Sequence, residues 1–216
     1  MLAYRVLWVS ACLALCLALS ATVYAVEGSF SQEGLAGVYG ADHHGKPTAG
    51  GETFDKDKLL AAHPFLPLGT QVRIVNLDTK KTVDVKIVDR GPTSGDRIVD
   101  VSPAAAKALG LAQGKTAPVR LESVGKIAGA SGNDLTGSFF VQLGAFRVVA
   151  NAEKVYKTLK EKGYAARLVA ITSGDKQIAK VQVGSFHKLS EAQKILHELT
   201  KAYAGAFIVA ETPSAY

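Results

Sequence analysis

The first residue with a position suited to chemistry is Asp89, in the stretch TVDVKIVDRGP at residues 82–92. Apolar and polar side chains alternate before it, which is typical of a half-buried strand, and this alternation places Asp89 on the apolar face. A glycine and a proline follow Arg90 and end the strand, because proline has no N–H for the ladder and glycine permits a sharp turn. A carboxyl group partly buried at such a break suits a general acid. The alternative is a structural contact of Asp89 with Arg90 or with backbone.

Short strands that surround one small helix must position this aspartate. Apolar strands at 72–77 and 83–88 flank a polar turn, which predicts a hairpin, and further strands are predicted at 97–101 and 119–123. Between them, Ser102 is a good N-cap, Pro103 a good first residue, and the helix formers of 104–109 end at Gly110. Residues 34–124 are therefore predicted to form an all-β barrel with one short helix.

The C-terminal part contains an internal repeat. VQLGAF at 141–146 returns as VQVGSF at 181–186, and an amphipathic helix with i, i+3, i+4, i+7 spacing follows each copy. Apolar strands at 166–171 and 206–209 come after the two helices. The order βαββαβ predicts an α+β domain of the ferredoxin-like (RNP-like) kind over residues 137–216, with two helices on one face of a four-stranded sheet.

The remaining segments lie outside these two domains. Residues 1–25 combine Arg5, an apolar run and small residues before a cleavage site, which predicts a secretory signal peptide and an exported protein. Residues 26–33 are expected to be a tether, and GKIAGASGNDLT at 125–136 a linker. Both cysteines, Cys12 and Cys16, fall in the signal peptide, and whether either carries a lipid anchor stays open. Apart from these segments, no contact with the membrane is expected.

The net charge limits the classes of molecule that this protein is expected to bind. The net charge of the chain is +6, and residues 137–216 alone hold eleven basic and six acidic side chains. A basic exported protein meets anionic polymers and surfaces. No basic run interleaved with aromatic residues and no nucleotide-binding glycine loop is present, so nucleic acid is not an expected partner. Asp42, His43 and His44 lack a further spaced ligand, so neither a metal nor another cofactor is expected.

Several motifs in fixed order resemble the rare lipoprotein A family: GLA and YG within 34–40, TA and ExFD within 48–55, AAH at 61–63, LPLGT at 66–70, DRGP at 89–92 and RIVDVS at 97–102. The resemblance implies a double-psi β-barrel. The C-terminal repeat resembles a SPOR domain, which in its family binds peptidoglycan strands stripped of stem peptides. Together the two resemblances cover nearly all of the chain after the signal peptide.

Members of this family include lytic transglycosylases, which cleave the MurNAc–GlcNAc bond without water and leave 1,6-anhydro ends. The resemblance implies that Asp89 and Glu52 are the two catalytic acids, with their roles left open, and that His63 orients an acid or the sugar. It also implies a monomer that acts on stripped glycan in the periplasm or cell envelope, with outer-membrane or septal association left open. The residues expected to bind the substrate are Tyr39, Thr48 and Arg90 in the barrel, and Gln142 and Gln182 on the sheet face away from the helices.

Other interpretations stay open for these residues. Glu52 could be a solvated loop carboxylate, His63 could cap a turn, and Asp100, opposite in parity to its apolar neighbours, is expected to be structural. Val38 and Gly50 stand where the family usually has tryptophan and asparagine, which puts substrate affinity in question. The main rival function is a non-catalytic, expansin-like protein that binds glycan as a scaffold at the division septum. An inverting endoglucanase would share the barrel but would leave the C-terminal domain unexplained.

Overall fold

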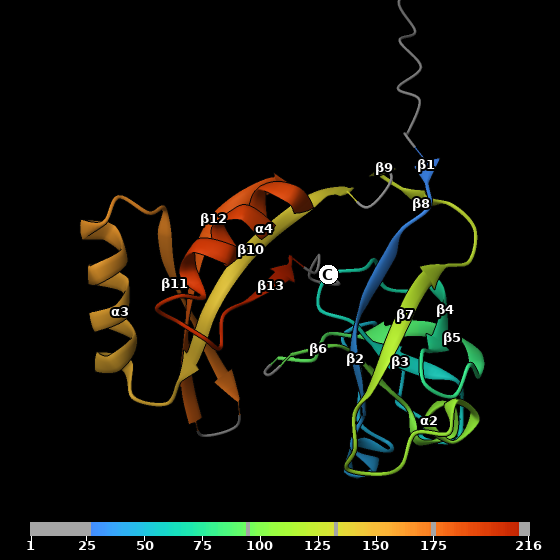
Figure 1. Ribbon diagram of the computed structural model, residues 1–216. Helices are drawn as coiled ribbons and strands as arrows, with labels where there is room; N and C mark the ends of the chain where they lie inside the picture. Colours follow the sequence, from blue (N-terminus) through green and yellow to red (C-terminus); the bar gives the residue numbers. More distant parts are fainter. Residues whose placement is uncertain (1–26, 94–95, 132–133, 174–175, 212–216) are drawn as a thin grey trace, which may run out of the picture.

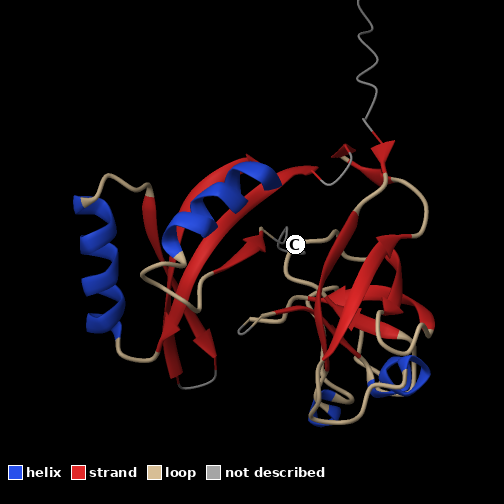
Figure 2. Cartoon of the chain, viewed as in Figure 1, coloured by secondary structure: helices blue, strands red, loops and turns tan. Residues whose placement is uncertain are grey.

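The computed structural model describes residues 27–93, 96–131, 134–173 and 176–211, which form two lobes joined by one segment (Figure 1). The predicted signal peptide, with Cys12 and Cys16, lies outside the described residues. Within those ranges, no helix is both long enough and apolar enough to cross a bilayer. The N-terminal lobe consists mostly of strands, and the C-terminal lobe combines a sheet with two helices (Figure 2).

The N-terminal lobe is a closed six-stranded barrel with the order β2-β6-β3-β5-β4-β7. Two of its strand pairs, β2 with β6 and β3 with β5, are parallel, and the other neighbours are antiparallel. Closure leaves the barrel without an exposed sheet edge. The barrel with few helices confirms the predicted fold class. Its strands are β2 Ser31–Val38, β3 Leu60–Ala62, β4 Gln71–Asn76, β5 Thr82–Asp89, β6 Arg97–Val101 and β7 Ala117–Ser123.

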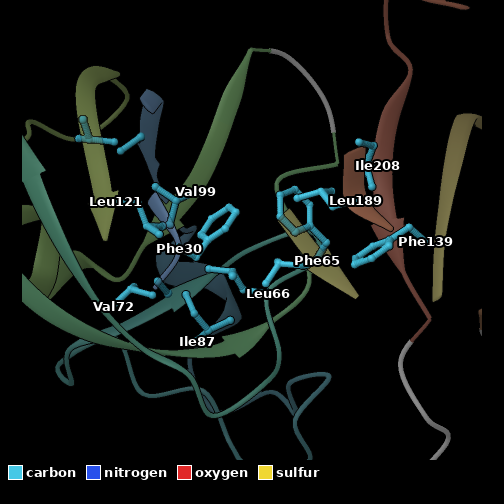
Figure 3. Packing of buried hydrophobic residues seen from close by; sticks show 14 of the residues in the cluster. Phe30, Phe65, Leu66, Val72, Ile87, Val99, Leu121, Phe139, Leu189 and Ile208 are labelled. Carbon is cyan, nitrogen blue, oxygen red and sulfur yellow. The ribbon is translucent and has the colours of Figure 1, made fainter. Parts of the chain in front are cut away.

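Apolar side chains at alternate strand positions fill the inside of this barrel. β4 and β5 form the predicted hairpin, and they bury Val72, Ile74, Val85 and Ile87 in the core shown in Figure 3. At the end of β5 the alternation stops, because Val88 is also buried, against a second small cluster on the other side. The last residue of the strand therefore sits between two apolar clusters.

One short helix, α2 Pro103–Leu109, closes one end of the barrel. The Ser102 hydroxyl accepts a hydrogen bond from Ala105 N–H at 3.2 Å and donates one to the carbonyl of Lys58 at 2.6 Å. Gly110 ends the helix in the left-handed conformation, with φ of 72°. Both predicted caps therefore act as expected, and the serine also fixes the loop before β3.

The C-terminal lobe has an antiparallel sheet of order β11-β12-β10-β13. The repeated strands are neighbours, so that Gln142 on β10 faces Gln182 on β12. Both helices contribute to the buried core together with the sheet. This is the predicted βαββαβ order. Its elements are β10 Asp134–Phe146, α3 Val149–Glu161, β11 Ala166–Ser173, β12 Lys176–Lys188, α4 Leu189–Leu199 and β13 Phe207–Ala210.

The segments expected to be a tether and a linker differ from the prediction. β1 Glu27–Gly28 pairs with β8 Ile127–Ala128, and β9 Ala130–Ser131 pairs with the start of β10. The reason is that each segment carries isolated apolar residues among its glycines. Phe30, Ile127 and Leu135 are only 3%, 6% and 3% exposed. Composition alone does not reveal these anchors, and the described residues of the two segments, 27–33, 125–131 and 134–136, are therefore largely strand.

Aromatic packing joins the two lobes. The Phe65 ring meets Phe30 edge-on at a centroid distance of 6.0 Å and Phe139 of the C-terminal lobe at 6.3 Å (Figure 3). Next to this contact, Ala210 N–H donates a hydrogen bond to the carbonyl of Pro64 at 3.3 Å. The C-terminal lobe thus rests on the barrel loop at residues 63–68.

Replacing Ser102 with alanine tests the cap. Because it removes three hydrogen bonds at a buried site, to Lys58, Leu60 and Ala105, we expect Ser102→Ala to lower the free energy of local opening of α2 by about 1–2 kcal/mol. Hydrogen exchange of the amides in residues 103–109 measures this change. Ser185→Ala, at an exposed serine of the other lobe, is the control. An unchanged exchange rate in Ser102→Ala would show that the cap does not stabilise the helix.

Candidate active site

The carboxylate of Asp89 lies at the end of β5 and accepts three hydrogen bonds. Tyr39 Oη donates to Oδ2 at 2.6 Å, and the backbone N–H groups of Ala49 and Arg90 donate to Oδ1 at 3.0 and 2.7 Å. Gly91, with φ of 147°, then turns the chain away from the strand, in a conformation that favours glycine. The side chain is therefore held in one orientation by groups from three parts of the chain.

Tyr39 follows β2 and lies between two other rings. Its centroid is 4.7 Å from that of Phe54 and 4.7 Å from that of His43. Burial raises the pKa of Tyr39 well above its ordinary value, and the hydrogen bond to Asp89 and the charge of that group raise it further. Tyr39 therefore keeps its proton and acts as a donor toward Asp89. Together with Val88 and Phe54, these two residues line a shallow depression.

The loop at residues 48–52 is bound to the end of β5. Gly50 N–H donates to the carbonyl of Val88 at 3.0 Å, and the Thr48 hydroxyl donates to the carbonyl of Glu52 at 2.8 Å. A Cβ at position 50 would come within 2.9 Å of the Val88 oxygen, so the close approach requires glycine. Thr48 shapes the loop that presents the Ala49 N–H to Asp89.

Glu52 forms an ion pair with Lys86, three residues before Asp89 on β5. The Nζ–Oε1 distance is 2.7 Å, and each side chain is 40% exposed. The pair places a carboxylate at the rim of the same strand end. An exposed pair of this kind contributes only about 0–1 kcal/mol to stability, so its main consequence is the position of the carboxylate.

His63 lies behind the strand end and is fully buried. Its Nδ1 accepts hydrogen bonds from the N–H groups of Phe65 and Leu66 at 3.3 and 3.1 Å, and its Nε2 faces Gln32 Oε1 at 3.3 Å. Burial, and secondarily the charge of Arg90, lowers the pKa of His63 to about 3, so the ring is neutral. The His63 side chain therefore caps a turn, which is the structural alternative considered from the sequence. Its link to the site is backbone: His63 N–H donates to the Asp89 carbonyl at 3.0 Å.

Arg90 faces the same loop rather than the depression. Its Nη1 donates to the carbonyl of Leu66 at 2.7 Å and to that of His63 at 3.4 Å. Burial lowers the pKa of Arg90, and the charge of Asp89 opposes this effect. The two consecutive side chains at the end of β5 thus point in different directions. Asp89 lines the depression, and Arg90 bonds the loop that packs against the C-terminal lobe.

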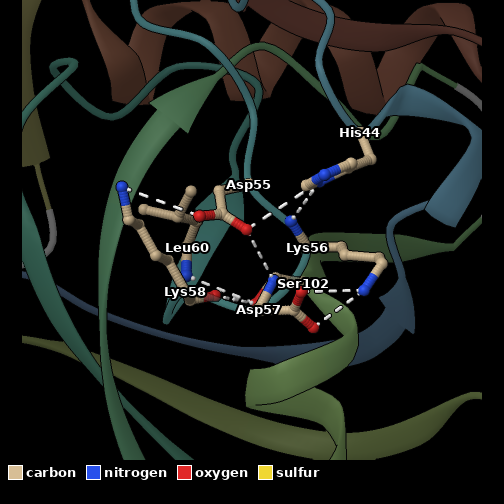
Figure 4. A network of polar contacts seen from close by, with 7 residues as sticks. All are labelled: His44, Asp55, Lys56, Asp57, Lys58, Leu60 and Ser102. Atoms are coloured by element: carbon tan, nitrogen blue, oxygen red, sulfur yellow. Dashed lines mark hydrogen bonds and ion pairs between the residues drawn. The ribbon is translucent and has the colours of Figure 1, made fainter.

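A polar network holds the second histidine of the pair, His44 (Figure 4). His44 Nδ1 accepts from Lys56 N–H at 3.2 Å and lies 3.8 Å from Asp55 Oδ1, while Lys58 Nζ lies 3.7 Å from the same carboxylate. The hydrogen bond from Asp57 N–H is the largest cause that lowers the pKa of Asp55. Among the described residues, no group of three histidine, cysteine, aspartate or glutamate side chains is arranged to hold a metal ion.

The two glutamines lie in the other lobe, away from Asp89. Gln182 Nε2 donates to Gln142 Oε1 at 3.1 Å, and Arg167 Nε donates to Gln182 Oε1 at 2.9 Å. The Arg167 guanidinium also lies 3.6 Å above the ring centroid of Phe140. The glutamines are only 5% and 7% exposed. The sheet face thus carries a connected polar row.

The structure brings together some of the predicted site residues. Tyr39, the loop of Thr48, and Asp89 meet directly, and Glu52 joins them through that loop. His63 and Arg90 support the strand end from behind. Asp100, buried and 2.8 Å from Arg97 Nη1, forms an ion pair within β6.

Sequence reasoning missed three groups. Lys86 and Arg167 have polar strand positions that look solvated, and the N–H of Ala49 has no sequence signal at all. The sequence offers one signal for Lys86: it is a charged residue between apolar ones in the strand that leads to Asp89.

The neutrality of His63 predicts a pH dependence. Its pKa in the folded state lies below the unfolded value of about 6.5, so its contribution to stability is present above pH 6.5 and is lost as the pH falls toward 3. Within this window we expect His63 to add a slope of about 1.4 kcal/mol per pH unit to the free energy of unfolding. Urea unfolding at several pH values measures it. His63→Asn keeps an acceptor near the Nδ1 position but does not titrate, so an equal slope in this variant would contradict the assignment.

Comparison with known proteins agrees with both lobes. A family model described as "Lytic transglycolase" matches residues 31–121, and the model of the SPOR domain matches residues 135–210. The protein named endolytic peptidoglycan transglycosylase RlpA from Campylobacter jejuni is 34% identical over 203 residues, which cover 83% of this chain and 72% of that protein. Proteins with the same name from Pseudomonas aeruginosa and Neisseria meningitidis are 47% and 45% identical over 96 and 95 residues. Each match covers 44% of this chain, but only 28% and 40% of those relatives. The chain therefore belongs to the RlpA (rare lipoprotein A) family of lytic transglycosylases.

Proposed function

We propose that the chain cleaves the MurNAc–GlcNAc bonds of peptidoglycan within the strand, prefers strands stripped of stem peptides, and leaves 1,6-anhydro ends. The observation that carries this proposal is the Asp89 carboxyl group, oriented by Tyr39 and two backbone N–H groups at the rim of a depression. A second carboxylate, Glu52, lies on the loop that binds the same strand end. Two carboxyl groups flanking a scissile bond are the usual requirement for glycosidic cleavage.

In the proposed mechanism Asp89 is the acid and Glu52 is the base, and the three donors that face Asp89 stabilise the carboxylate that remains after it has given up its proton. Asp89, in its protonated form, gives its proton to the glycosidic oxygen, and the bond between this oxygen and C1 of the MurNAc residue breaks. The C6 hydroxyl of the same residue then forms a bond to C1 and loses its proton to Glu52. Lys86, 2.7 Å from Glu52, holds this carboxylate in place, and the carboxylate also stabilises the positive charge that develops on the sugar. Water does not enter the product.

The C-terminal lobe is proposed to bind the stripped strand. The row formed by Gln142, Gln182 and Arg167 offers amide and guanidinium groups, which suit the hydroxyl groups of sugars. The excess of basic residues in this lobe suits an anionic wall polymer. The proposed place of action is the cell wall of the envelope, as a monomer. A non-catalytic, expansin-like role would keep this binding and leave the acids without a function.

Replacing the acids tests the chemistry. We expect Asp89→Asn to lower the rate of release of anhydro-ended fragments by about 10²–10⁴-fold, because the general acid is lost, and Glu52→Gln to lower it similarly. Mass spectrometry of the soluble products from stripped and from intact peptidoglycan measures the rate and the preference. Asp78→Asn, at an exposed turn carboxylate, is the matched control. Binding of strands by folded wild-type protein without soluble product would favour the scaffold role.

Tyr39→Phe separates orientation from proton transfer. The variant keeps the ring between Phe54 and His43 but removes the donor to Asp89 Oδ2. We expect kcat to fall by about tenfold, the value of one hydrogen bond to a charged group, with little change in KM. Steady-state kinetics on stripped strands measures both. A rise in KM at constant kcat would instead make Tyr39 a substrate-binding residue.

A further inference from the structure

A cleft of about 160 Å³ lies between the two lobes and borders the turn that follows Asp89. Arg90, Pro92 and Thr93 contribute to one wall, and Gln142 and Lys180 of the sheet contribute to the other. Asp89 does not line it, because its carboxylate is turned to Tyr39 and Ala49. The cleft is therefore a second site, one residue away in sequence from the proposed acid.

The charge of this cleft has one sign. Lys180 and Arg90 border it, and none of the described residues that line it is acidic. Arg90 is held by the carbonyls of the loop at residues 63–68, so it acts through its charge rather than through its hydrogen bonds. Lys180 is half-buried on β12, in a position where its ammonium group can contact a bound molecule. Such a site favours an anion.

The other lining groups fit a sugar. Pro64, Pro92 and Phe207 provide apolar surfaces for the C–H faces of a ring, while the Thr93 hydroxyl and the Gln142 amide can bond hydroxyl or acetamido groups. The volume is below the range of roughly 300–1,000 Å³ that is usual for whole small ligands. The cleft is thus sized for one unit of a polymer.

We infer that this cleft binds one carboxylate-bearing sugar of the glycan strand, and that both lobes share the site. This inference rests on the proposed function, since it names a subsite for the same substrate. When the stem peptide is removed, water hydrolyses the amide on the lactyl group of the muramic residue, the peptide leaves with a free amino group, and the lactyl group carries a free carboxylate. Lys180 and Arg90 would select for this charge. Stripped strands are then recognised by the lactyl carboxylate that peptide removal creates, as well as by the absence of the bulky peptide.

Binding to Asp89→Asn protein tests the inference without cleavage. Calorimetric titration uses stripped glycan strands and, as a neutral probe, chitooligosaccharides, which have no lactyl carboxylate. We expect Lys180→Ala to weaken binding of stripped strands about tenfold and to leave the neutral probe unchanged, because a charged hydrogen bond is lost only with the former. The difference should shrink at high salt. Lys160→Ala, on the exposed side of α3, is the control. Equal weakening of both probes would overturn the carboxylate recognition.

Thr93→Glu tests whether the barrel shares the site. The residue is exposed and on the barrel side of the cleft, so a new carboxylate there should repel the strand without unfolding the protein. We expect a loss of about tenfold for stripped strands, and none for Thr116→Glu at an exposed barrel position away from the cleft. Unchanged binding in Thr93→Glu would overturn the shared site, and so would absent binding in the Asp89→Asn parent. Strand binding by wild-type protein without cleavage would overturn the proposed function alone.

Discussion

Two consecutive side chains at the end of β5 point in different directions. Their contacts connect the candidate site on one side with the loop that carries the C-terminal lobe on the other. Asp89 turns to Tyr39 and the Ala49 N–H, and Arg90 turns to the carbonyls of the loop at residues 63–68. His63 fixes the same loop with its ring and donates its N–H to the Asp89 carbonyl. Because these partners are mostly backbone groups, the orientation of the carboxylate is set by the barrel itself. The C-terminal lobe packs on the loop that completes this arrangement.

The two proposed acids, Asp89 and Glu52, differ in what holds them. Asp89 is surrounded by donors from three segments, whereas Glu52 has one exposed lysine. Three hydrogen bonds from different segments restrict a carboxylate more than one exposed ion pair does. Asp89 is therefore the rigid partner, and Glu52 can adjust to a bound chain. This asymmetry follows from the local contacts and does not depend on the family to which the chain belongs.

Periodicity predicted most of the fold. The hairpin of β4 and β5, the capped helix α2 and the repeated βαβ units each have a local pattern, and each was found where it was predicted. The parts that were missed depend on contacts between distant residues. β3 has only three residues, and β1 and β8 are ordered through buried residues such as Phe30 and Ile127. The pairing of Glu52 with Lys86 likewise has no local signal, since it joins a loop to a strand 34 positions later.

The repeat in the C-terminal lobe affects whether this lobe can distinguish the two ends of a bound polymer. Gln142 and Gln182 occupy equivalent places in the two copies, and they face each other on neighbouring antiparallel strands. A local pseudo-twofold axis therefore passes between them. A polymer lying across this axis would meet the same two amides whichever end came first, so these amides cannot distinguish its reducing end from its non-reducing end. Polarity has to come from the parts that do not repeat, such as Arg167, which bonds Gln182, and the barrel turn at residues 90–93, which lines a cleft together with Gln142.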